Sequence, residues 1–548
     1  MPLQKNQVLT LRVERLSSDG SGVAHSPDGE TVFIPGAAPG DEARVRIVKD
    51  CKRYAFGILD EVLTPSPDRI PVDCAVAGPC GGCSLRHLDY AAELRAKQEN
   101  VADAFARIGG LDVPVLPIVG SPEVNRYRNK VQFPVGVDKS GKPCIGFYAG
   151  RTHRIVPCPD CRLQPGVLNE IGNALCAFFA EKGIQPYSEE TGRGLVRHIF
   201  LRRGAHSGQI MVCLVCTRAK LPSAEELCTR LKAQFAEITT ILLNVNAKNT
   251  NVILGTETHT LYGPGYIEDT LCGVPVQLGP LSFYQVNTLA AEQLYGIAAQ
   301  YAQLTPDDLL LDLYCGMGTI GLSMAAHCRE LIGVEIVPEA IESAKANAAR
   351  MGADVAAKSR FFCADAGQAA TRLAAEGLHP DIVMLDPPRK GCDEATLSAV
   401  VRMSPRRVVY VSCNPATAAR DAAWLEQNGY HAKKVQPVDL FPRTRHCEAV
   451  LLLSKLNVDR HIEVEVSMDE PDVTAAESKA TYNEIREHVW EHHQLKVSNL
   501  YIAQVKQKYG IIERENYNKP KSENAKQPKC PKEKEDAIVE ALKHFQMI

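Results

Sequence analysis

Two glycines and three acidic residues are spaced as in a nucleotide-binding site. The apolar run LLLDL, residues 309–313, contains Asp312 and leads through a turn with Gly316 and Gly318 into a helical stretch. Such a turn lets the backbone approach a ligand closely at the carboxyl edge of a parallel sheet. Glu335 ends the next apolar run 23 residues after Asp312, near the spacing of roughly 20 residues at which a carboxylate binds ribose hydroxyls. Asp365 follows a further strand-like run and can accept from an adenine amino group.

The glycine turn alone does not identify the ligand, because many tight turns contain the sequence Gly-x-Gly. A nicotinamide nucleotide is the natural alternative. The turn, however, lacks the third glycine of the dehydrogenase pattern, and dehydrogenases have no need of the DPPRKG sequence at residues 386–391.

A second group of residues suits a metal or an iron-sulfur cluster. Cys74, Cys80 and Cys83 have the spacing Cys-x5-Cys-x2-Cys among small residues, and either Cys158 or Cys161 in IVPCPDCRLQ can supply a fourth thiolate. Spacing alone also permits tetrahedral zinc, and the alternative to any metal site is that these cysteines are free thiols. The chain has nineteen cysteines, which in a reducing compartment point to ligation, catalysis or core packing rather than to disulfides.

Basic residues alternate with aromatic ones in two segments. NRYRNKVQFPV places cationic side chains beside Tyr127 and Phe133, and RGLVRHIFLRR adds a second set. This mixture suits phosphates and unstacked bases of RNA, whereas a solvated strand edge is the alternative. The candidate RNA-binding residues are Arg126, Arg128, Lys130, Arg197 and His198.

Composition excludes a membrane protein and predicts several domains. The 548 residues exceed one ordinary core, and the formal net charge of -3 gives no general attraction to a polyanion. Neither an export signal nor a run of about 18 apolar residues is visible, which predicts a cytoplasmic protein, expected to be a monomer.

Five regions must position these residues. Alternating short runs predict an antiparallel OB-like β-barrel over residues 1–65 with a basic face, and mixed strands and helices predict an α+β central domain over 66–280. Strands and helices alternate over 281–455, as in a doubly wound, Rossmann-like parallel sheet. An acidic linker over 456–478 and a helical extension over 479–548 complete the chain. The extension contains two helices around Trp490 and Tyr501, which fit either a helix-turn-helix or a generic helical appendage.

Five motifs in one order resemble the bacterial uracil-5 RNA methyltransferases over most of residues 1–455. The motifs are SFYQVN (282–287), LDLYCGMGTIGL (311–322), DPPRKG (386–391), VYVSCNPAT (409–417) and DLFPRTRHCEAV (439–450). The resemblance implies a multidomain α/β protein with a class I S-adenosylmethionine-dependent methyltransferase domain and a TRAM or OB-like barrel. It also favours Cys161 as the fourth ligand of a 4Fe-4S cluster, with Cys158 a departure from the family pattern.

The same resemblance assigns roles to the site residues. Cys413 is the expected nucleophile and Glu448 the expected base. Asp312, Gly316 and Gly318 are expected at the methionine end of the cofactor, while Glu335 is expected to hold the ribose and Asp365 the adenine. The other expected pocket residues are Gln285, Tyr314, Thr319 and Asp386, the last of which could equally hold the uracil edge.

The proposed chemistry explains these residue types. C5 of uracil is a weak nucleophile, so a thiolate adds to C6 and generates an enolate that can take the methyl group. A base must then remove the C5 proton before the cysteine can leave. Without its context Cys413 would read as a small buried residue. DPPR also differs from the DPPY of amino-group methyltransferases and lacks the cysteine that RNA cytosine-5 enzymes carry.

The expected substrate is uridine in 23S ribosomal RNA, because related tRNA enzymes typically lack the barrel and the cysteine cluster. Transfer RNA remains the alternative substrate. A binding protein with an inert methyltransferase domain is the competing hypothesis from another class, and the intact Cys413, Glu448 and cofactor loop argue against it.

Overall fold

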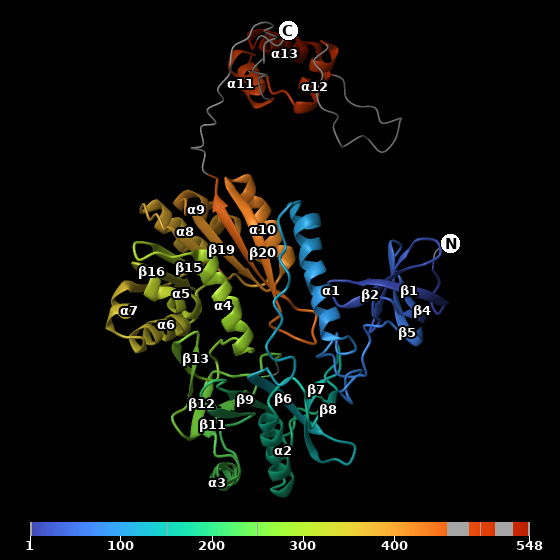
Figure 1. Ribbon diagram of the computed structural model, residues 1–548, viewed down its shortest axis with the longest axis vertical. Helices are drawn as coiled ribbons and strands as arrows, with labels where there is room; N and C mark the ends of the chain where they lie inside the picture. Colours follow the sequence, from blue (N-terminus) through green and yellow to red (C-terminus); the bar gives the residue numbers. More distant parts are fainter. Residues whose placement is uncertain are drawn as a thin grey trace. The chain divides into compact units, whose positions relative to one another are not determined.

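The computed structural model describes residues 3–150, 152–248, 250–456, 482–493, 495–509 and 530–545. The chain divides into two compact units, Met1–Val458 and Asp459–Ile548 (Figure 1). The acidic linker expected at 456–478 lies, apart from Leu456, outside the described residues. No helix in the described ranges is long and apolar enough to cross a membrane.

A closed five-stranded barrel begins the first unit, with strand order β1-β2-β3-β5-β4. Val13, Val32 and Val45 point inward and are buried, since side chains alternate along each strand. The expectation of a wholly antiparallel barrel is wrong in one pair, because β3 and β5 are parallel. A ring with an odd number of alternating strands must contain one such pair. The strands are β1 (Val8–Leu16), β2 (Ser21–His25), β3 (Thr31–Pro35), β4 (Glu42–Asp50) and β5 (Tyr54–Thr64).

The central region contains a seven-stranded sheet of order β12-β11-β10-β9-β6-β7-β8. Its strands are β6 (Lys130–Val137), β7 (Pro143–Tyr148), β8 (Ile155–Pro157), β9 (Val196–Arg203), β10 (Ile210–Cys216), β11 (Ile238–Val245) and β12 (Glu257–Tyr262). Leu201 and Val212 pack on one face with α2 (Gly166–Glu181) and α3 (Ala224–Gln234). Phe200 and Met211 face the catalytic region. Both faces are therefore covered, which explains why β10 is apolar throughout.

A hairpin of β13 (Ile267–Leu271) and β14 (Val274–Leu278) leads into the catalytic region. There a second seven-stranded sheet has the order β17-β16-β15-β18-β19-β21-β20. Its first five strands run parallel, and β21 is antiparallel to both of its neighbours. The strands are β15 (Leu309–Leu313), β16 (Glu330–Glu335), β17 (Ser359–Cys363), β18 (Ile382–Leu385), β19 (Arg407–Ser412), β20 (Tyr430–Val438) and β21 (Glu448–Lys455).

Helices cover both faces of the catalytic sheet, as expected for a doubly wound fold. Apolar residues of α4 (Thr288–Ala302), α5 (Thr319–Met324) and α6 (Pro338–Arg350) pack on one face. Those of α8 (Ala366–Ala375), α9 (Glu394–Met403) and α10 (Pro415–Gln427) pack on the other. The short α7 (Ala353–Lys358) lies between α6 and β17 in the chain.

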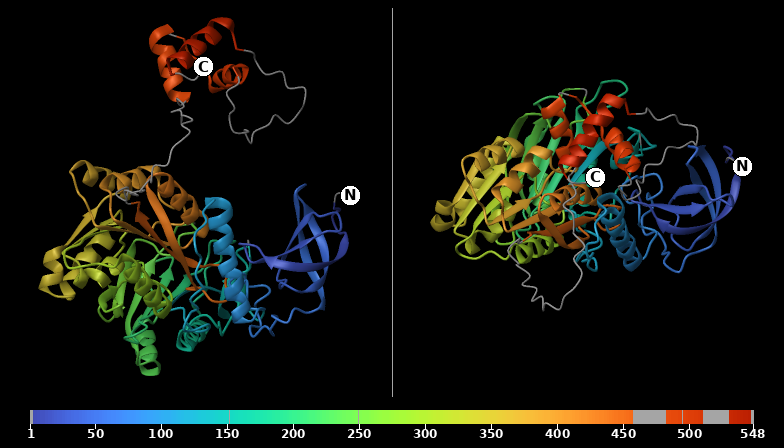
Figure 2. Two further views of the ribbon diagram at one scale, coloured as in Figure 1. Left: turned by 45° about the horizontal axis from the view of Figure 1, so that its top comes forward. Right: turned by 90° about the horizontal axis from the view of Figure 1, so that it is seen from above.

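One helix crosses from the N-terminal half of the chain to the catalytic sheet. Helix α1 (Tyr90–Asp103) and the following π-helical turn, Ala104–Gly109, pack beside α10 and β20 (Figure 2). The chain then runs along β20, where Val115 and Val119 form parallel bridges to Val435 and Val438. The catalytic region is thus completed by residues some 300 positions away in the sequence.

The second unit has a small apolar core between three helices. They are α11 (Tyr482–His493), α12 (Asn499–Lys508) and α13 (Lys532–His544). Val489, Ile502 and Ile538 are buried among them. The Lys/Pro-rich segment that precedes α13 lies largely outside the described residues.

Candidate active site

A pocket of about 1340 Å³ lies at the carboxyl ends of the parallel strands, where open α/β sheets bind their ligands. Each parallel strand places a side chain in the pocket, because its apolar residues end at this edge of the sheet and a polar residue lies at or just after the strand end. Nine of the expected residues line the pocket: Gln285, Tyr314, Gly316, Thr319, Glu335, Asp365, Asp386, Cys413 and Glu448. The structure thus brings together residues from five separate motifs.

The glycine loop has the backbone shape that the sequence predicts. Gly316 and Gly318 have positive φ angles of 55° and 80°, and Gly318 is the N-cap residue of α5. A Cβ on Gly318 would also lie 3.1 Å from Leu322. Tyr314 has a φ of 67° as well, a conformation that is strained for a residue with a bulky side chain. The loop is therefore held in a shape that exposes its backbone to the pocket.

Asp312 and Glu335 act on this loop in different ways. Asp312 is buried and accepts a hydrogen bond from Gly321 N at 3.0 Å, so it supports the loop from behind rather than lining the pocket. Burial raises the pKa of Asp312 to about 8. Glu335 lines the pocket and accepts from Gly316 N at 3.2 Å and from Val337 N at 3.0 Å. Its carboxylate is therefore fixed at the end of β16.

The nucleophile and base candidates share one end of the pocket. Cys413 follows β19 directly, and Glu448 is the first residue of β21, the neighbouring strand. Burial raises the pKa of Glu448 to about 8, with repulsion from Asp386 adding to it and Arg389 opposing it. Burial likewise raises the pKa of Asp386 to about 7.

Arg389 is a residue whose importance the sequence did not reveal. Burial, together with the nearby carboxyls of Glu448 and Asp386, raises the pKa of the Cys413 thiol to about 11, and the Arg389 guanidinium opposes this rise. Asn414 Nδ2 donates to Arg389 O at 3.0 Å, which fixes the DPPR turn to the start of α10. The DPPR motif itself is the signal that could have identified this cation.

Exposed apolar side chains in the pocket were also missed. Leu281 is 67% exposed and Phe283 is 73% exposed, although both line the pocket. Ile336 and Val337, directly after Glu335, are also exposed pocket residues. Exposed apolar side chains that gather in one pocket are typical of a binding site, so these positions suit the planar faces of bases.

The expected RNA-binding residues are only partly exposed. Arg126 forms a two-pronged ion pair with Asp160, at 2.7 and 3.0 Å, and Arg128 donates to Lys130 O. Burial and, to a smaller extent, repulsion from nearby arginines lower the pKa of Lys130 to about 8. Arg126 and Arg128 therefore make polar contacts within the protein, and Lys130 is partly buried.

Arg197 and His198 differ more strongly from the expectation. Both are buried within β9, and Arg197 donates to the carbonyls of Asn246 and Lys248 at 3.1 and 2.6 Å. Burial lowers the pKa of His198 to about 4. These two residues are consecutive in a strand that is covered on both faces rather than forming a solvated cationic edge, and the structure gives Arg197 contacts to the protein backbone.

Five cysteines converge near the central sheet. A hydrogen bond from Cys158 lowers the pKa of Cys161 to about 7. Burial raises the pKa of Cys83, against the effect of Arg86, and Cys161 and Cys80 raise it further. The electrostatic neighbours of Cys158 include Cys74 and Cys80. Within the described ranges, no three His, Cys, Asp or Glu side chains form a group that could hold a metal ion.

Arg86 is buried beside this cysteine group. It donates to Asp73 Oδ1 at 2.7 Å and to Asn125 Oδ1 at 3.0 Å. Its Nε and Nη2 atoms have no hydrogen-bond partner in the described part of the chain, although they are buried. A buried cation with free donors suits a neighbouring anionic group.

Comparison with known proteins identifies the parts of the first unit. The family described as tRNA (Uracil-5-)-methyltransferase matches residues 207–456, and the TRAM domain matches residues 2–59. An uncharacterized RNA methyltransferase of Halalkalibacterium halodurans is 43% identical over 457 residues, 83% of this chain and 99% of the relative. One of Oceanobacillus iheyensis is 41% identical over 455 residues, 83% of this chain and 98% of the relative.

A solved structure extends the likeness to three dimensions. The Pyrococcus abyssi tRNA (uracil-54, C5)-methyltransferase in complex with S-adenosyl-L-homocysteine matches with a TM-score of 0.65 and 26% identity. The match covers 82% of this chain and all of that chain. The expected fold class, a class I methyltransferase domain with an N-terminal barrel, is confirmed. The chain belongs to the TRAM-containing family of RNA uracil-5-methyltransferases.

Proposed function

We propose that this enzyme methylates C5 of a uridine in 23S ribosomal RNA, with S-adenosylmethionine as the methyl donor. The observation that carries the proposal is the shared pocket, in which the glycine loop and Glu335 lie at one end and Cys413, Arg389 and Glu448 at the other. When S-adenosylmethionine and a uracil ring are bound in this pocket, their reacting atoms lie between these two sets of residues.

The residues present fit this donor. Glu335 offers a fixed carboxylate for ribose hydroxyls, and Ile336 and Val337 offer exposed apolar surface to an adenine ring. The positive φ angles of the loop let its backbone approach the methionine part. The donor supplies a sulfonium methyl group, and its positive charge suits a pocket with several carboxyls.

The chemistry assigns one step to each side chain. Cys413 Sγ bonds to C6 of uracil, and the electron pair displaced from the C5–C6 double bond forms an enolate. C5 then takes the methyl group, and the donor leaves as a neutral thioether. Glu448 removes the C5 proton, the double bond re-forms, and the C6–S bond breaks to return the thiolate. Arg389 favours the thiolate form that begins and ends this sequence.

Ribosomal RNA is the proposed substrate because the chain combines a TRAM barrel with the cysteine group. Transfer RNA is the second candidate, and a specific observation favours it. The solved structure of a tRNA (uracil-54, C5)-methyltransferase matches this chain along the whole of the solved chain. A protein of this architecture is therefore named for tRNA in another organism. We place the reaction in the cytoplasm and expect a monomer.

We also propose that Cys74, Cys80, Cys83 and Cys161 hold a 4Fe-4S cluster. A cluster binds one thiolate at each iron, so its ligands stand farther apart than the four ligands of a single zinc ion. Besides burial, electrostatic neighbours that include Cys74, Cys80 and Cys161 raise the pKa of Cys80 or Cys83, so the four thiols lie near one another, as a shared cluster requires. Arg86 supplies a buried positive charge beside the anionic cluster. The cluster's proposed role is structural, since methyl transfer requires no electrons.

The substrate proposal is tested by mapping 5-methyluridine in ribosomal and transfer RNA from cells with and without the gene. Loss of a methyl group from 23S RNA alone is the expected result. Loss from transfer RNA alone would establish the second candidate. Methyl transfer from labelled S-adenosylmethionine to protein-free transcripts, abolished by Cys413→Ala, separates an enzyme from a binding protein with an inert methyltransferase domain.

A further inference from the structure

The segment that carries the proposed base has no regular secondary structure of its own. Residues 439–447 connect β20 to Glu448 at the start of β21. Phe441 and His446 of this segment line the pocket. We call residues 439–447 the base loop. Since the loop ends at Glu448, whatever holds it also sets the position of the base.

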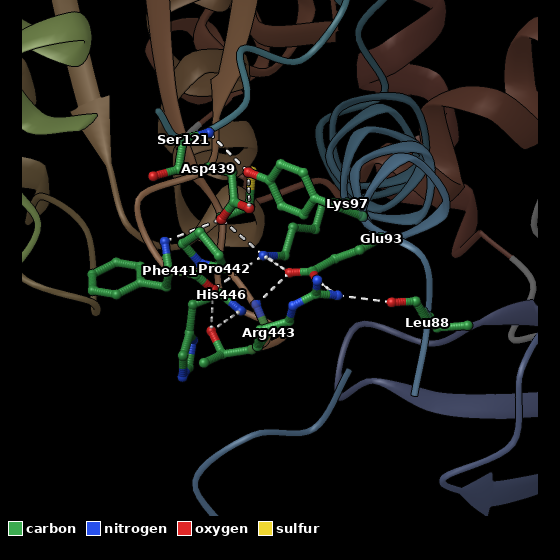
Figure 3. Close-up of polar contacts among 12 residues, drawn as sticks. Leu88, Glu93, Lys97, Ser121, Asp439, Phe441, Pro442, Arg443 and His446 are labelled. Atoms are coloured by element: carbon green, nitrogen blue, oxygen red, sulfur yellow. Dashed lines mark hydrogen bonds and ion pairs between the residues drawn. The ribbon is translucent and has the colours of Figure 1, made fainter. Parts of the chain in front are cut away.

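A buried ion network from α1 holds this loop (Figure 3). Lys97 Nζ donates to Asp439 Oδ1 at 2.8 Å, to Glu93 Oε1 at 2.7 Å and to Phe441 O at 3.2 Å. Glu93 and Asp439 are fully buried, and Lys97 is 2% exposed. One ammonium group thus ties α1 to both the first carboxylate and a backbone carbonyl of the loop.

Further side chains satisfy the backbone of the base loop one residue at a time. Tyr90, also on α1, donates to Asp439 Oδ2 at 3.0 Å. The other contacts are Asn287 Nδ2 to Leu440 O (3.0 Å), Tyr127 Oη to Pro442 O (3.0 Å) and Arg443 N to Glu93 Oε1 (2.7 Å). Side chains therefore replace the hydrogen bonds that a helix or strand would give the loop.

The network is balanced in charge. Glu93 and Asp439 carry the negative charges, and Lys97 and Arg443 the positive ones, with Arg443 Nη1 3.7 Å from Glu93 Oε2. A buried network of this kind costs desolvation and contributes little net stability, whereas it specifies one geometry. The network contacts the base loop, which leads directly to Glu448, so the geometry that it specifies includes the position of the base.

We propose that Lys97 and Glu93 are positioning residues for proton abstraction, which makes α1 a functional part of the active site. This inference rests on the proposed function of Glu448 as the base. Helix α1 lies outside residues 207–456, the part that matches the uracil-5-methyltransferase family. Its role comes from the contacts across some 340 residues of sequence, not from that match.

The test changes α1 alone. In Glu93→Gln/Lys97→Met the network loses one charge of each sign, and the amide oxygen that replaces the Glu93 carboxylate can still accept from Arg443 N. We expect this variant to melt above Lys97→Met, which leaves two buried carboxylates opposite one cation. If the network served stability alone, the turnover of the double variant would exceed that of Lys97→Met, just as its melting temperature does.

The positioning role predicts instead a selective loss of one step. Turnover of the double variant should fall roughly 10- to 100-fold, because small displacements of a reacting group have effects of that size. The dissociation constants for RNA and for S-adenosylmethionine should stay within about threefold, since the cofactor loop and the cysteine are untouched. Methylated protein–RNA adduct should accumulate on denaturing gels, because elimination waits for the base.

A matched control uses a partly buried ion pair at the amino ends of two strands of the same sheet. Arg406 Nη2 donates to Asp308 Oδ2 at 2.7 Å, next to the first residues of β15 and β19. Asp308→Asn/Arg406→Met should lower the melting temperature without adduct accumulation. If Glu93→Gln/Lys97→Met does not fold, Tyr90→Phe, which deletes one hydroxyl, decides by the same adduct assay, with a smaller accumulation expected.

The two proposals fail in different ways. Wild-type enzyme that forms neither adduct nor 5-methyluridine would contradict the proposed function. Wild-type turnover by the double variant, or a loss of turnover without adduct, would overturn the positioning role. An unchanged adduct level in folded Tyr90→Phe would overturn it as well.

Discussion

Removing the charge of Glu448 should stabilise the enzyme, and more so as the pH rises. Burial raises the pKa of this carboxyl from an ordinary 4.5 to about 8. A carboxyl that holds its proton more tightly in the folded state weakens folding as the pH rises from the unfolded pKa through the folded one. Integrating between these two values gives a cost of about 1 kcal/mol at pH 5 and about 3 kcal/mol at pH 7.

The assay compares the melting temperatures of wild-type protein and Glu448→Gln at pH 5 and pH 8. Any cost of burying the amide is independent of pH, so the change in the difference reports the carboxyl together with its repulsion from Asp386. The cost rises by about 3.5 kcal/mol between pH 5 and pH 8, which corresponds to roughly 3 to 4 °C for a cooperative unit of the size of Met1–Val458. Glu376→Gln, an exposed carboxylate paired with Arg372, is the control and should show no trend. Equal differences at both pH values would refute the raised pKa of Glu448.

Other predictions address the donor, the cysteine group and the second unit. Glu335→Gln should weaken S-adenosylmethionine binding about tenfold or more in calorimetry, because a charged acceptor is lost, while RNA binding stays unchanged; equal affinity for the donor would reject the ribose role. Cys161→Ser should remove iron from anaerobically purified protein, whereas Cys158→Ser should retain it, and the reverse metal contents would exchange the two ligands. A chain ending at Leu456 should keep wild-type turnover, since Met1–Val458 is a compact unit by itself; a folded but inactive product would show that the second unit is needed.

The geometry of the glycine loop and the places of its acidic neighbours could be predicted from the sequence. Asp312, Gly316 and Glu335 follow from the alternation of apolar runs with polar residues, because the carboxyl ends of parallel strands meet at one edge. Local spacing could not distinguish a pocket residue from a support. Asp312 turned out to be the support, as its carboxylate accepts from Gly321 N behind the loop.

Burial on both faces of a sheet is harder to predict. The sequence suggested a cationic edge at Arg197 and His198 because basic residues are interleaved with aromatic ones in this part of the chain, yet β9 is covered by α2 on one side and by the catalytic region on the other. Partners of a strand are set by tertiary packing, which alternation along one strand does not encode. The exposed Phe283 poses the opposite problem, since a large apolar residue, of a type usually found in the core, faces the pocket.

Contacts between distant segments could not be predicted at all. Nothing near Lys97 in the sequence indicates Asp439, 342 residues later. The i,i+4 spacing of Glu93 and Lys97 is that of an ordinary exposed helix pair. The sequence therefore predicts an exposed ion pair, whereas both side chains are buried in the structure. Only the structure reveals that it faces the base loop.

The identity of the nucleophile is the central claim, and one crosslinking measurement tests it most directly. RNA carrying 5-fluorouridine should be trapped after methyl transfer, because the fluorine at C5 cannot leave as a proton does. We expect the wild-type enzyme to form a denaturation-resistant adduct whose protease fragments carry the methylated base on Cys413. We expect Cys413→Ala to form no adduct. An adduct on any of the other cysteines, or an undiminished adduct with Cys413→Ala, would contradict it.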